Sequence, residues 1–323
     1  MALENILVSM PTRPWHRERF QQAMPEANFV FQDSNTMADD ELAPFDAIVG
    51  YVNPNRLHTL TNLKLLQLSF SGVMEGFLAL REKQPQAILC SASGAYGQAI
   101  AEYQLAGLLS VYKLLPQYRD NQHKKVWTDL GRMRSIRDAT VLVVGAGSIG
   151  SEFAALVKAL GARVIGIRRS QAEAMPPFDQ MHTMDQLDEL LPQADVVSLS
   201  LPGTKDTTHV MDARRFGLMK QDAVIMNVGR GSAIDQDAML EAIRSGRLSG
   251  AVIDVTTPEP LPQDSPLWEE PRILLTPHVS GLFNLDITWE NVVDIAIHNL
   301  SHWPRGPFVS RVDYESGYRE RVG

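Results

Sequence analysis

Residues 140–170 read TVLVVGAGSIGSEFAALVKALGARVIGIRRS, and this stretch is the strongest indication of the architecture. Its pattern is an apolar strand, a glycine-rich turn, an amphipathic helix and a second strand, with Gly145, Gly147 and Gly150 spaced as G-x-G-x-x-G. Gly145 permits a tight turn, Gly147 lets the backbone approach a pyrophosphate, and Gly150 lets helix and strand pack closely. Because these parts occur in order, the stretch predicts a dinucleotide-binding turn rather than an ordinary glycine-rich loop.

The end of the second strand indicates which dinucleotide the turn would hold. NAD-binding proteins carry an acidic residue there for the ribose hydroxyls, whereas this chain has Arg168, Arg169 and Ser170. Guanidinium groups bind phosphate bidentately, so the sequence favours NADP(H) over NAD(H), unless the arginines are only solvated surface charges. The mid-chain position of the motif disfavours FAD without excluding it. Between the glycines, Ser148 and Ile149 complete the predicted pyrophosphate contact.

The alternation of strands and helices continues through the second half of the chain. Apolar strand runs occur at 140–144, 163–167, 194–201, 223–228, 250–255 and 272–276. Helical patterns lie between them at 149–160, 184–191, 212–219 and 236–245. A series of this kind predicts a doubly wound parallel sheet of the Rossmann type.

The first hundred residues form a second series. It alternates strand runs at 5–10, 28–31, 47–52, 65–70 and 87–90 with helical patterns at 16–24 and 72–80. With 323 residues, the chain is long enough for two domains of roughly 100–200 residues each. We therefore expect an α/β protein with two doubly wound parallel-sheet domains and a cleft between them. The Rossmann-type dinucleotide-binding domain is expected at 99–284, and a flavodoxin-like substrate-binding domain at 1–98 and 285–323, which includes a last helix at 286–303.

Residues 100–118, IAEYQLAGLLSVYKLLPQY, predict a helix that is apolar around its whole circumference. Such a helix must be covered on all sides, by the second domain or by a second subunit. We expect both kinds of cover, and therefore a homodimer.

Composition restricts the partners and the compartment. The chain is 44% hydrophobic, and its formal net charge of -8 opposes nonspecific attraction to nucleic acid or an anionic membrane. No apolar run approaches the ~18 residues of a membrane span, and the first residues lack a secretion signal pattern. The single Cys90 excludes internal disulfides and multi-cysteine metal sites. A single cysteine fits a reducing compartment, so we expect a cytoplasmic protein. We also expect no bound metal, since the helix pair His298 and His302 lacks an acidic third ligand.

Three residues with catalytic potential follow consecutive strand runs of the second half. Arg230 comes after AVIMNVG, Glu259 after GAVIDVTTP and His278 after ILLTP. Ligands of open α/β sheets bind beyond the carboxyl ends of the strands, so we expect these side chains to face one site. There an arginine can hold a carboxylate, and a histidine kept protonated by a neighbouring carboxylate can give its proton to an oxygen.

Each of these residues alone also fits an ordinary role. Arg230 could be a cap or surface residue, Glu259 a solvated loop acid and His278 a turn histidine. Behind a dinucleotide motif, however, the set predicts hydride transfer to a 2-keto acid that is clamped by its carboxylate and protonated by the histidine.

Six segments resemble the D-isomer-specific 2-hydroxyacid dehydrogenase family, and the resemblance covers nearly the whole chain. They read ASGAYGQAIAEY, VLVVGAGSIG, SLSLPGTKDTTHVM, NVGRGSAID, GAVIDVTTPEPLPQDSPLW and LLTPHVSG. Within the family, the chain looks most like the glyoxylate/hydroxypyruvate and broader 2-ketoacid reductases. The resemblance implies Arg230 as substrate clamp, Glu259 as partner of the histidine, and His278 as general acid in reduction and base in oxidation.

The resemblance also implies further ligand contacts. Asp254 is expected to hold the nicotinamide carboxamide, and the other implied cofactor residues are Leu201, Pro202, Val228, Gly229 and Gly281. On the substrate side, the resemblance implies that the backbone of Ser71, Gly72 and Val73 binds the carboxylate, and Tyr51 of the N-terminal domain is expected to line the pocket.

Two departures from the family pattern leave the pocket shape and the substrate size open. Thr256 stands where the family commonly has an aromatic residue, and Met74 and Glu75 stand where an Asp follows the Gly-Val pair. Trp127 stands where some relatives extend an aromatic side chain towards a neighbouring active site, although it fits packing within the chain equally well.

The favoured function is that of a cytoplasmic, homodimeric, NADP(H)-preferring reductase that forms D-2-hydroxy acids from small 2-keto acids. Another dehydrogenase of the family, such as 3-phosphoglycerate dehydrogenase, is an alternative. A formate dehydrogenase is disfavoured, because that branch has Gln where Glu259 stands. A non-catalytic, corepressor-like dinucleotide sensor that binds partner proteins is the alternative from another class, since such relatives retain the three catalytic residues.

Overall fold

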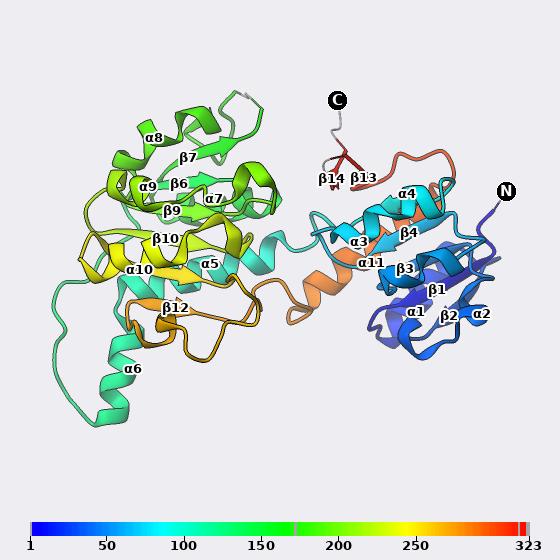
Figure 1. Ribbon diagram of the computed structural model, residues 1–323, viewed down its shortest axis with the longest axis horizontal. Helices are drawn as coiled ribbons and strands as arrows, with labels where there is room; N and C mark the ends of the chain where they lie inside the picture. The colour runs from blue at the N-terminus through cyan, green and yellow to red at the C-terminus, as the bar shows by residue number, and fades with distance from the viewer. Residues whose placement is uncertain (1, 171–172, 316, 321–323) are drawn as a thin grey trace. The chain divides into compact units, whose positions relative to one another are not determined.

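The computed structural model describes residues 2–170, 173–315 and 317–320. The chain divides into two compact units (Figure 1). Unit 1 comprises Met1–Tyr96 and Phe283–Gly323, and unit 2 comprises Gly97–Leu282. Each unit is built on a parallel sheet, so the prediction of two parallel-sheet α/β domains is confirmed.

In the described part of unit 2, seven parallel strands form one sheet in the order β12-β11-β10-β9-β6-β7-β8 (Figure 1). The strands are β6 (Thr140–Val144), β7 (Arg163–Arg168), β8 (Gln180–Thr183), β9 (Val196–Leu199), β10 (Ala223–Asn227), β11 (Leu248–Ile253) and β12 (Ile273–Leu275). The chain winds outward in both directions from β6, which gives a switch point between β6 and β9. Doubly wound sheets hold their ligands beyond the strand ends at such a point.

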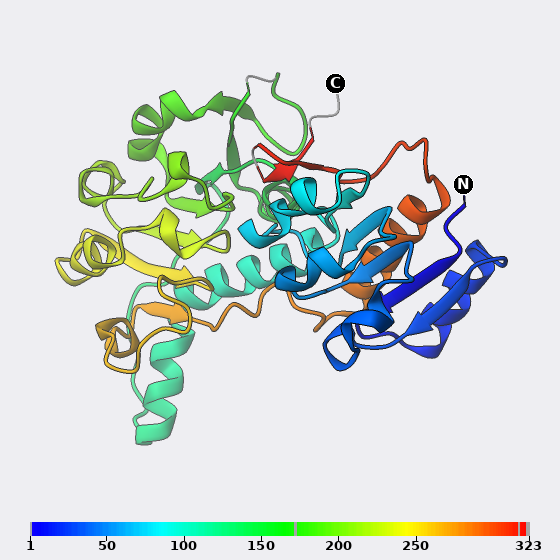
Figure 2. The same ribbon diagram turned by 45° about the vertical axis from the view of Figure 1, so that its right-hand side comes forward.

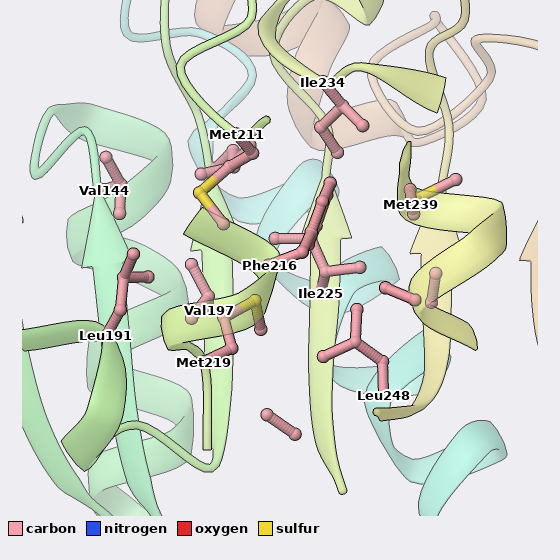
Figure 3. Packing of buried hydrophobic residues seen from close by; sticks show 14 of the residues in the cluster. Val144, Leu191, Val197, Met211, Phe216, Met219, Ile225, Ile234, Met239 and Leu248 are labelled. Atoms are coloured by element: carbon pink, nitrogen blue, oxygen red, sulfur yellow. The ribbon is translucent and has the colours of Figure 1, made fainter. Parts of the chain in front are cut away.

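Helices cover both faces of this sheet. They are α5 (Gly97–Tyr112), α7 (Ser148–Ala159), α8 (Leu187–Leu190), α9 (Ala213–Leu218) and α10 (Gln236–Arg244), whereas the further helix α6 (Leu115–Lys124) contains no buried residue. Because successive strand side chains point to opposite faces, Val143 packs with α5 and α7, whereas Val144 packs with α8, α9 and α10. Figure 3 shows the second cluster, in which Val144 and Ile225 of the strands lie with Phe216 of α9.

In unit 1, the described residues form a parallel sheet in the order β2-β1-β3-β4-β5, which is the flavodoxin-like order. The strands are β1 (Asn5–Ser9), β2 (Asn28–Phe31), β3 (Ala47–Gly50), β4 (Leu65–Leu68) and β5 (Ile88–Cys90). The helices are α1 (Pro14–Ala23), α2 (Asp39–Leu42), α3 (Glu75–Leu78), α4 (Leu80–Lys83) and α11 (Asp286–Ser301). Near the end of the chain, β13 (Val312–Asp313) and β14 (Tyr318–Arg319) form a short antiparallel pair.

The last long helix, α11, packs in unit 1 against α1 and β4. Its Glu290 carboxylate accepts a hydrogen bond from Arg19 Nη1 at 2.6 Å and lies 2.9 Å from Nε2 of the buried His16. Cys90, the last residue of β5, is fully buried in the same unit.

The structure differs from the predicted elements in several places. The helix predicted over 72–80 is instead two short helices, α3 and α4. The helix predicted over 100–118 is broken, because α5 ends at Tyr112, Leu114 adopts a left-handed conformation with φ of +56°, and α6 starts anew. Pro116 explains the break, since proline lacks an N–H and its ring clashes with the carbonyl one turn earlier. Strand β8 was not predicted, because its residues QMHT are half-exposed and show no apolar run.

The described residues contain neither a helix that could span a bilayer nor a cluster of side chains that could hold a metal ion. No helix there is both long enough and apolar enough to cross a membrane. No cluster of three or more His, Cys, Asp or Glu side chains there is arranged to hold a metal ion. The rings of His298 and His302 stack on each other, with centroids 4.0 Å apart.

Candidate active site

The glycine turn joins β6 to α7 and leaves open space beside its middle glycine. Gly145 has a φ of +104°, and a Cβ built on it would lie 2.7 Å from the Ser200 carbonyl oxygen. A Cβ on Gly150 would lie 2.3 Å from the Gly145 carbonyl oxygen. Both positions therefore exclude a side chain. A Cβ on Gly147 would have no neighbour within 4 Å, so a ligand can approach the backbone there.

The start of α7 supplies hydrogen-bond donors to this open space. Gly147 is the N-cap, and Ser148 and Ile149 are the first residues of the helix. Their N–H groups precede the first bonds within the helix, and the positive end of the helix dipole lies there. The donors and the space fit the pyrophosphate of a dinucleotide.

The residues predicted to hold a 2′-phosphate lie at the carboxyl end of β7, the strand next to β6. Arg168 is the last residue of β7, and Arg168, Arg169 and Ser170 are all exposed. Within residues 2–170, 173–315 and 317–320, neither guanidinium is paired with a carboxylate. Unpaired guanidinium groups at this position suit a phosphate ligand.

The loops after β9 and β10 lie against each other on the other side of β6. The Val228 N–H donates a hydrogen bond to the Leu199 carbonyl at 3.1 Å. A Cβ on Gly229 would lie 2.6 Å from the carbonyl oxygen of Leu201, which Pro202 follows. The structure thus brings these predicted cofactor residues together near the switch point, and their contact with a cofactor stays a prediction.

His278 and Glu259 form a hydrogen-bonded pair. Nδ1 of His278 lies 2.8 Å from Oε2 of Glu259. The other carboxylate oxygen, Oε1, accepts a hydrogen bond from the Thr256 N–H at 3.0 Å. The side chains are 47% and 38% exposed, so a ligand can reach the pair. Because Nδ1 faces Glu259, Nε2 is the ring atom left to face a substrate.

Arg230 follows β10, and a buried asparagine holds its backbone in place. Asn227 Nδ2 donates to the Arg230 carbonyl at 2.9 Å, and Asn227 Oδ1 accepts from the Gly229 N–H at 3.0 Å. Within the described residues the Arg230 guanidinium has no acidic partner, and its Nη1 donates to the Gly229 carbonyl at 2.8 Å. Arg230, Glu259 and His278 therefore follow three neighbouring strands, β10, β11 and β12.

Asp254, which follows β11, is 1% exposed and binds the loop that carries the histidine. Its Oδ1 accepts hydrogen bonds from Thr276 Oγ1 at 2.6 Å and from the Val279 N–H at 2.9 Å. Its Oδ2 accepts from the Ser280 N–H at 3.0 Å and from Ser280 Oγ. These donors lie on both sides of His278, so the carboxylate fixes that loop. The predicted contact of Asp254 with nicotinamide stays a prediction.

In unit 1, the predicted substrate residues lie after neighbouring strands. Tyr51 directly follows β3, and Ser71, Gly72 and Val73 come shortly after β4, which pairs with β3. All of them are half-buried, and the centroid of the Tyr51 ring lies 6.4 Å from that of Phe70. The structure brings this loop and Tyr51 to one edge of the sheet, and their contact with a substrate stays a prediction.

Asn227, Thr276 and Ser280 are not among the predicted site residues, although their side chains hold the loops of the site. Asn227 ends β10, Thr276 follows β12, and Ser280 comes just before the predicted cofactor residue Gly281. The sequence signal that could have identified them is a polar residue at the end of an apolar strand, because a buried polar side chain must find hydrogen-bond partners.

A family model describes the greater part of unit 2. The model for the D-isomer specific 2-hydroxyacid dehydrogenase, NAD binding domain, matches residues 105–280. The matched segment includes the glycine turn and all three residues that follow β10, β11 and β12.

Similar proteins extend the likeness to unit 1. A glyoxylate/hydroxypyruvate reductase A of Citrobacter koseri is 29% identical over 224 residues, which cover 69% of this chain and 70% of that protein. A D-3-phosphoglycerate dehydrogenase of Haemophilus influenzae is 32% identical over 189 residues, 57% of this chain and 45% of that protein.

Among solved structures, a D-isomer specific 2-hydroxyacid dehydrogenase family protein from Aeromonas salmonicida has a TM-score of 0.83 and 30% identity. The match covers 97% of this chain and 100% of that one. The chain therefore belongs to the D-isomer specific 2-hydroxyacid dehydrogenase family and is an NAD(P)-dependent hydroxyacid dehydrogenase.

Proposed function

We propose that this dehydrogenase reduces small 2-keto acids to D-2-hydroxy acids and prefers NADP(H). The observation that carries the proposal is the 2.8 Å contact between His278 Nδ1 and Glu259 Oε2, at the same sheet edge as Arg230 and the glycine turn. A proton donor, a carboxylate clamp and a dinucleotide turn are the groups that this reduction requires.

The residues divide the reaction between them. The bound nicotinamide supplies the hydride that reaches the keto carbon. Arg230 holds the substrate carboxylate with its guanidinium fork and so orients the keto group. The imidazolium of His278 gives its Nε2 proton to the keto oxygen, which becomes the hydroxyl, while Glu259 holds Nδ1 and balances the charge. In the oxidation of a hydroxy acid, the neutral imidazole takes that proton back.

The NADP(H) preference rests on Arg168, Arg169 and Ser170. Their exposed side chains lie at the end of β7, where an NAD enzyme would place a carboxylate. Without such a carboxylate, a 2′-phosphate meets no repulsion and finds two guanidinium groups.

A homodimer in the cytoplasm completes the proposal. Both views show α6 and the segment after it projecting from the sheet of unit 2 (Figures 1 and 2), and α6 contains no buried residue. The projecting segment exposes the large apolar side chains Val126, Trp127, Leu130 and Met133. A second copy of the chain would remove this apolar surface from water.

The test is the initial rate of NADPH or NADH oxidation with glyoxylate, hydroxypyruvate, pyruvate, 2-ketobutyrate, phenylpyruvate and 3-phosphohydroxypyruvate. We expect turnover of small keto acids, with a higher kcat/KM for NADPH. Selective turnover of 3-phosphohydroxypyruvate would instead assign a phosphoglycerate dehydrogenase. Tight dinucleotide binding without turnover of any keto acid would contradict a reductase and support the sensor function.

A further inference from the structure

A line of hydrogen bonds runs from helix α5 to the loop of the catalytic histidine. The Tyr103 hydroxyl oxygen lies 2.5 Å from Thr276 Oγ1, and Thr276 Oγ1 lies 2.6 Å from Asp254 Oδ1. Tyr103 and Thr276 are 173 residues apart in the sequence. The contact is therefore made by the fold of unit 2 and not by local chain geometry.

The Asp254 carboxylate and the Tyr103 hydroxyl at the two ends determine which group donates each hydrogen bond in this line. An ionised carboxylate only accepts hydrogen bonds, so Thr276 must donate to Asp254, and its oxygen is then left to accept from Tyr103. Burial raises the pKa of the Tyr103 hydroxyl to about 12, so that it keeps its proton at any physiological pH. Tyr103 is thus a fixed donor at the start of the line.

At the other end, Asp254 determines the backbone path through His278. Its side chain accepts from the Val279 and Ser280 N–H groups, and its carbonyl accepts from the His278 N–H at 2.7 Å. His278 has a φ of +53°, a left-handed conformation that residues other than glycine adopt at a cost unless their surroundings hold them. The hydrogen bonds of Asp254 on both sides of His278 supply that hold.

We propose that Tyr103 is a positioning residue for the reaction, acting through Thr276 and Asp254 on the loop that presents His278. This inference rests on the proposed function of His278 as the proton donor. By orienting the Thr276 hydroxyl, Tyr103 keeps the Asp254 carboxylate aligned with the loop, so that the imidazole stays against Glu259 with Nε2 presented to the substrate.

The test compares two tyrosine-to-phenylalanine variants in helix α5. Tyr103→Phe removes only the hydroxyl that starts the line. Tyr112→Phe makes the same change in a buried tyrosine whose hydroxyl has no hydrogen-bond partner among the described residues, so it is the matched control. We expect Tyr103→Phe to lower kcat roughly three- to tenfold, as the loss of one buried hydrogen bond does, and to leave the KM for NADPH within about twofold. Tyr112→Phe should leave both constants unchanged.

A double-mutant cycle tests whether Tyr103 acts through Thr276. If it does, Tyr103→Phe has no further effect on kcat in a Thr276→Val background, whereas Thr276→Ser keeps the hydroxyl and retains most of the activity. Additive losses in the cycle, or equal kcat values for the two phenylalanine variants, would overturn the proposal.

A readout without turnover separates this proposal from the proposed function. We expect Tyr103→Phe, but not Tyr112→Phe, to speed amide hydrogen exchange in the peptide that contains His278, Val279 and Ser280. Unchanged exchange in that peptide contradicts the positioning role even in an active enzyme. If Tyr103→Phe speeds this exchange but the protein turns over no keto acid, the result would support the role of Tyr103 in holding the loop. The same result would contradict the proposed reductase function.

Discussion

At the scale of single residues, the site depends on a few groups whose partners are fixed by hydrogen bonds. The Glu259 carboxylate is hydrogen-bonded to Nδ1 of His278. This contact leaves Nε2 as the ring atom that can react with a substrate. Asn227 does the same for Arg230, since it holds the turn from which the guanidinium extends. The chemical groups are common, and their orientation is what makes them a site.

Replacing His278 tests the proton transfer directly. We expect His278→Gln to lower kcat at least ~100-fold, because general acid catalysis contributes factors of that order, while the Kd for NADPH changes little. Absorbance assays and cofactor fluorescence titrations measure the two quantities. His209→Gln is the control, since His209 is also exposed in unit 2 and also has a positive φ. Equal loss of cofactor binding in the His278 variant would indicate a structural role.

The proposed preference for NADPH over NADH depends on the residues at the carboxyl end of β7. We expect Arg168→Ala to raise the KM for NADPH roughly tenfold or more, the effect of losing a charged hydrogen bond, and to leave the KM for NADH nearly unchanged. Arg163→Ala is the matched control, because Arg163 is an exposed arginine at the opposite end of β7. If both cofactors were affected equally by Arg168→Ala, the 2′-phosphate assignment would be wrong.

At the scale of elements, the features that could be predicted are those whose whole sequence pattern lies within one short stretch of the chain. The turn between β6 and α7 was predictable because glycine spacing, strand and helix patterns all lie within one stretch of sequence. The break between α5 and α6 was missed, since the apolar run across it outweighed the single Pro116. The contact between Tyr103 and Thr276 could not be predicted, because only the sheet brings α5 and the segment after β12 together.

An acid-sensitive ion pair lies in the segment before β12, next to helix α10. The hydrogen bond from Arg272, at 2.7 Å, holds the pKa of the buried Glu270 carboxyl below its ordinary value of 4.5, and Arg272 also donates to the Ile243 carbonyl in α10. Since the folded-state pKa is lowered, this stabilisation is present above pH 4.5 and is lost as the pH falls through the folded-state value.

We therefore expect Glu270→Gln to lower the free energy of unfolding of unit 2 by about 1 kcal/mol at pH 7, because Arg272 is partly exposed and solvent weakens the pair. The difference from wild type should shrink as the pH drops below 4.5. Urea unfolding at several pH values measures it. The exposed neighbour Glu269, changed to Gln, is the control and should show no such dependence. A difference that is constant with pH would contradict the assignment.

At the scale of the whole molecule, unit 1 is built from the first and last segments of the chain, and unit 2 is formed by the residues between them in the sequence. The family match lies within unit 2, where the dinucleotide turn and the three strand-end residues are found. Unit 1 offers the Tyr51 side chain and the loop from Ser71 to Val73 at its own strand ends. The division agrees with a cofactor unit and a substrate unit, which are the roles that we propose for them.

The projecting segment after α6 leads to an assembly prediction. We expect wild-type protein to sediment at twice the chain mass, and a Trp127→Ser, Leu130→Ser double variant to shift towards monomer at micromolar concentration, because exposed apolar side chains drive association. Trp268→Ser removes another exposed tryptophan of unit 2, outside that segment, and should remain dimeric. Sedimentation velocity distinguishes the species. A wild-type monomer would contradict the homodimer.

The burial of Cys90 gives unit 1 its own chemical reporter. The thiol is the only one in the chain, and burial raises its pKa to about 12, so it is neither accessible nor ionised in the folded unit. A thiol-reactive dye can therefore label the protein only when unit 1 opens. The labelling rate would follow the opening of that unit alone, whatever happens to the cofactor unit, and would allow the two stabilities to be measured separately in one unmodified protein.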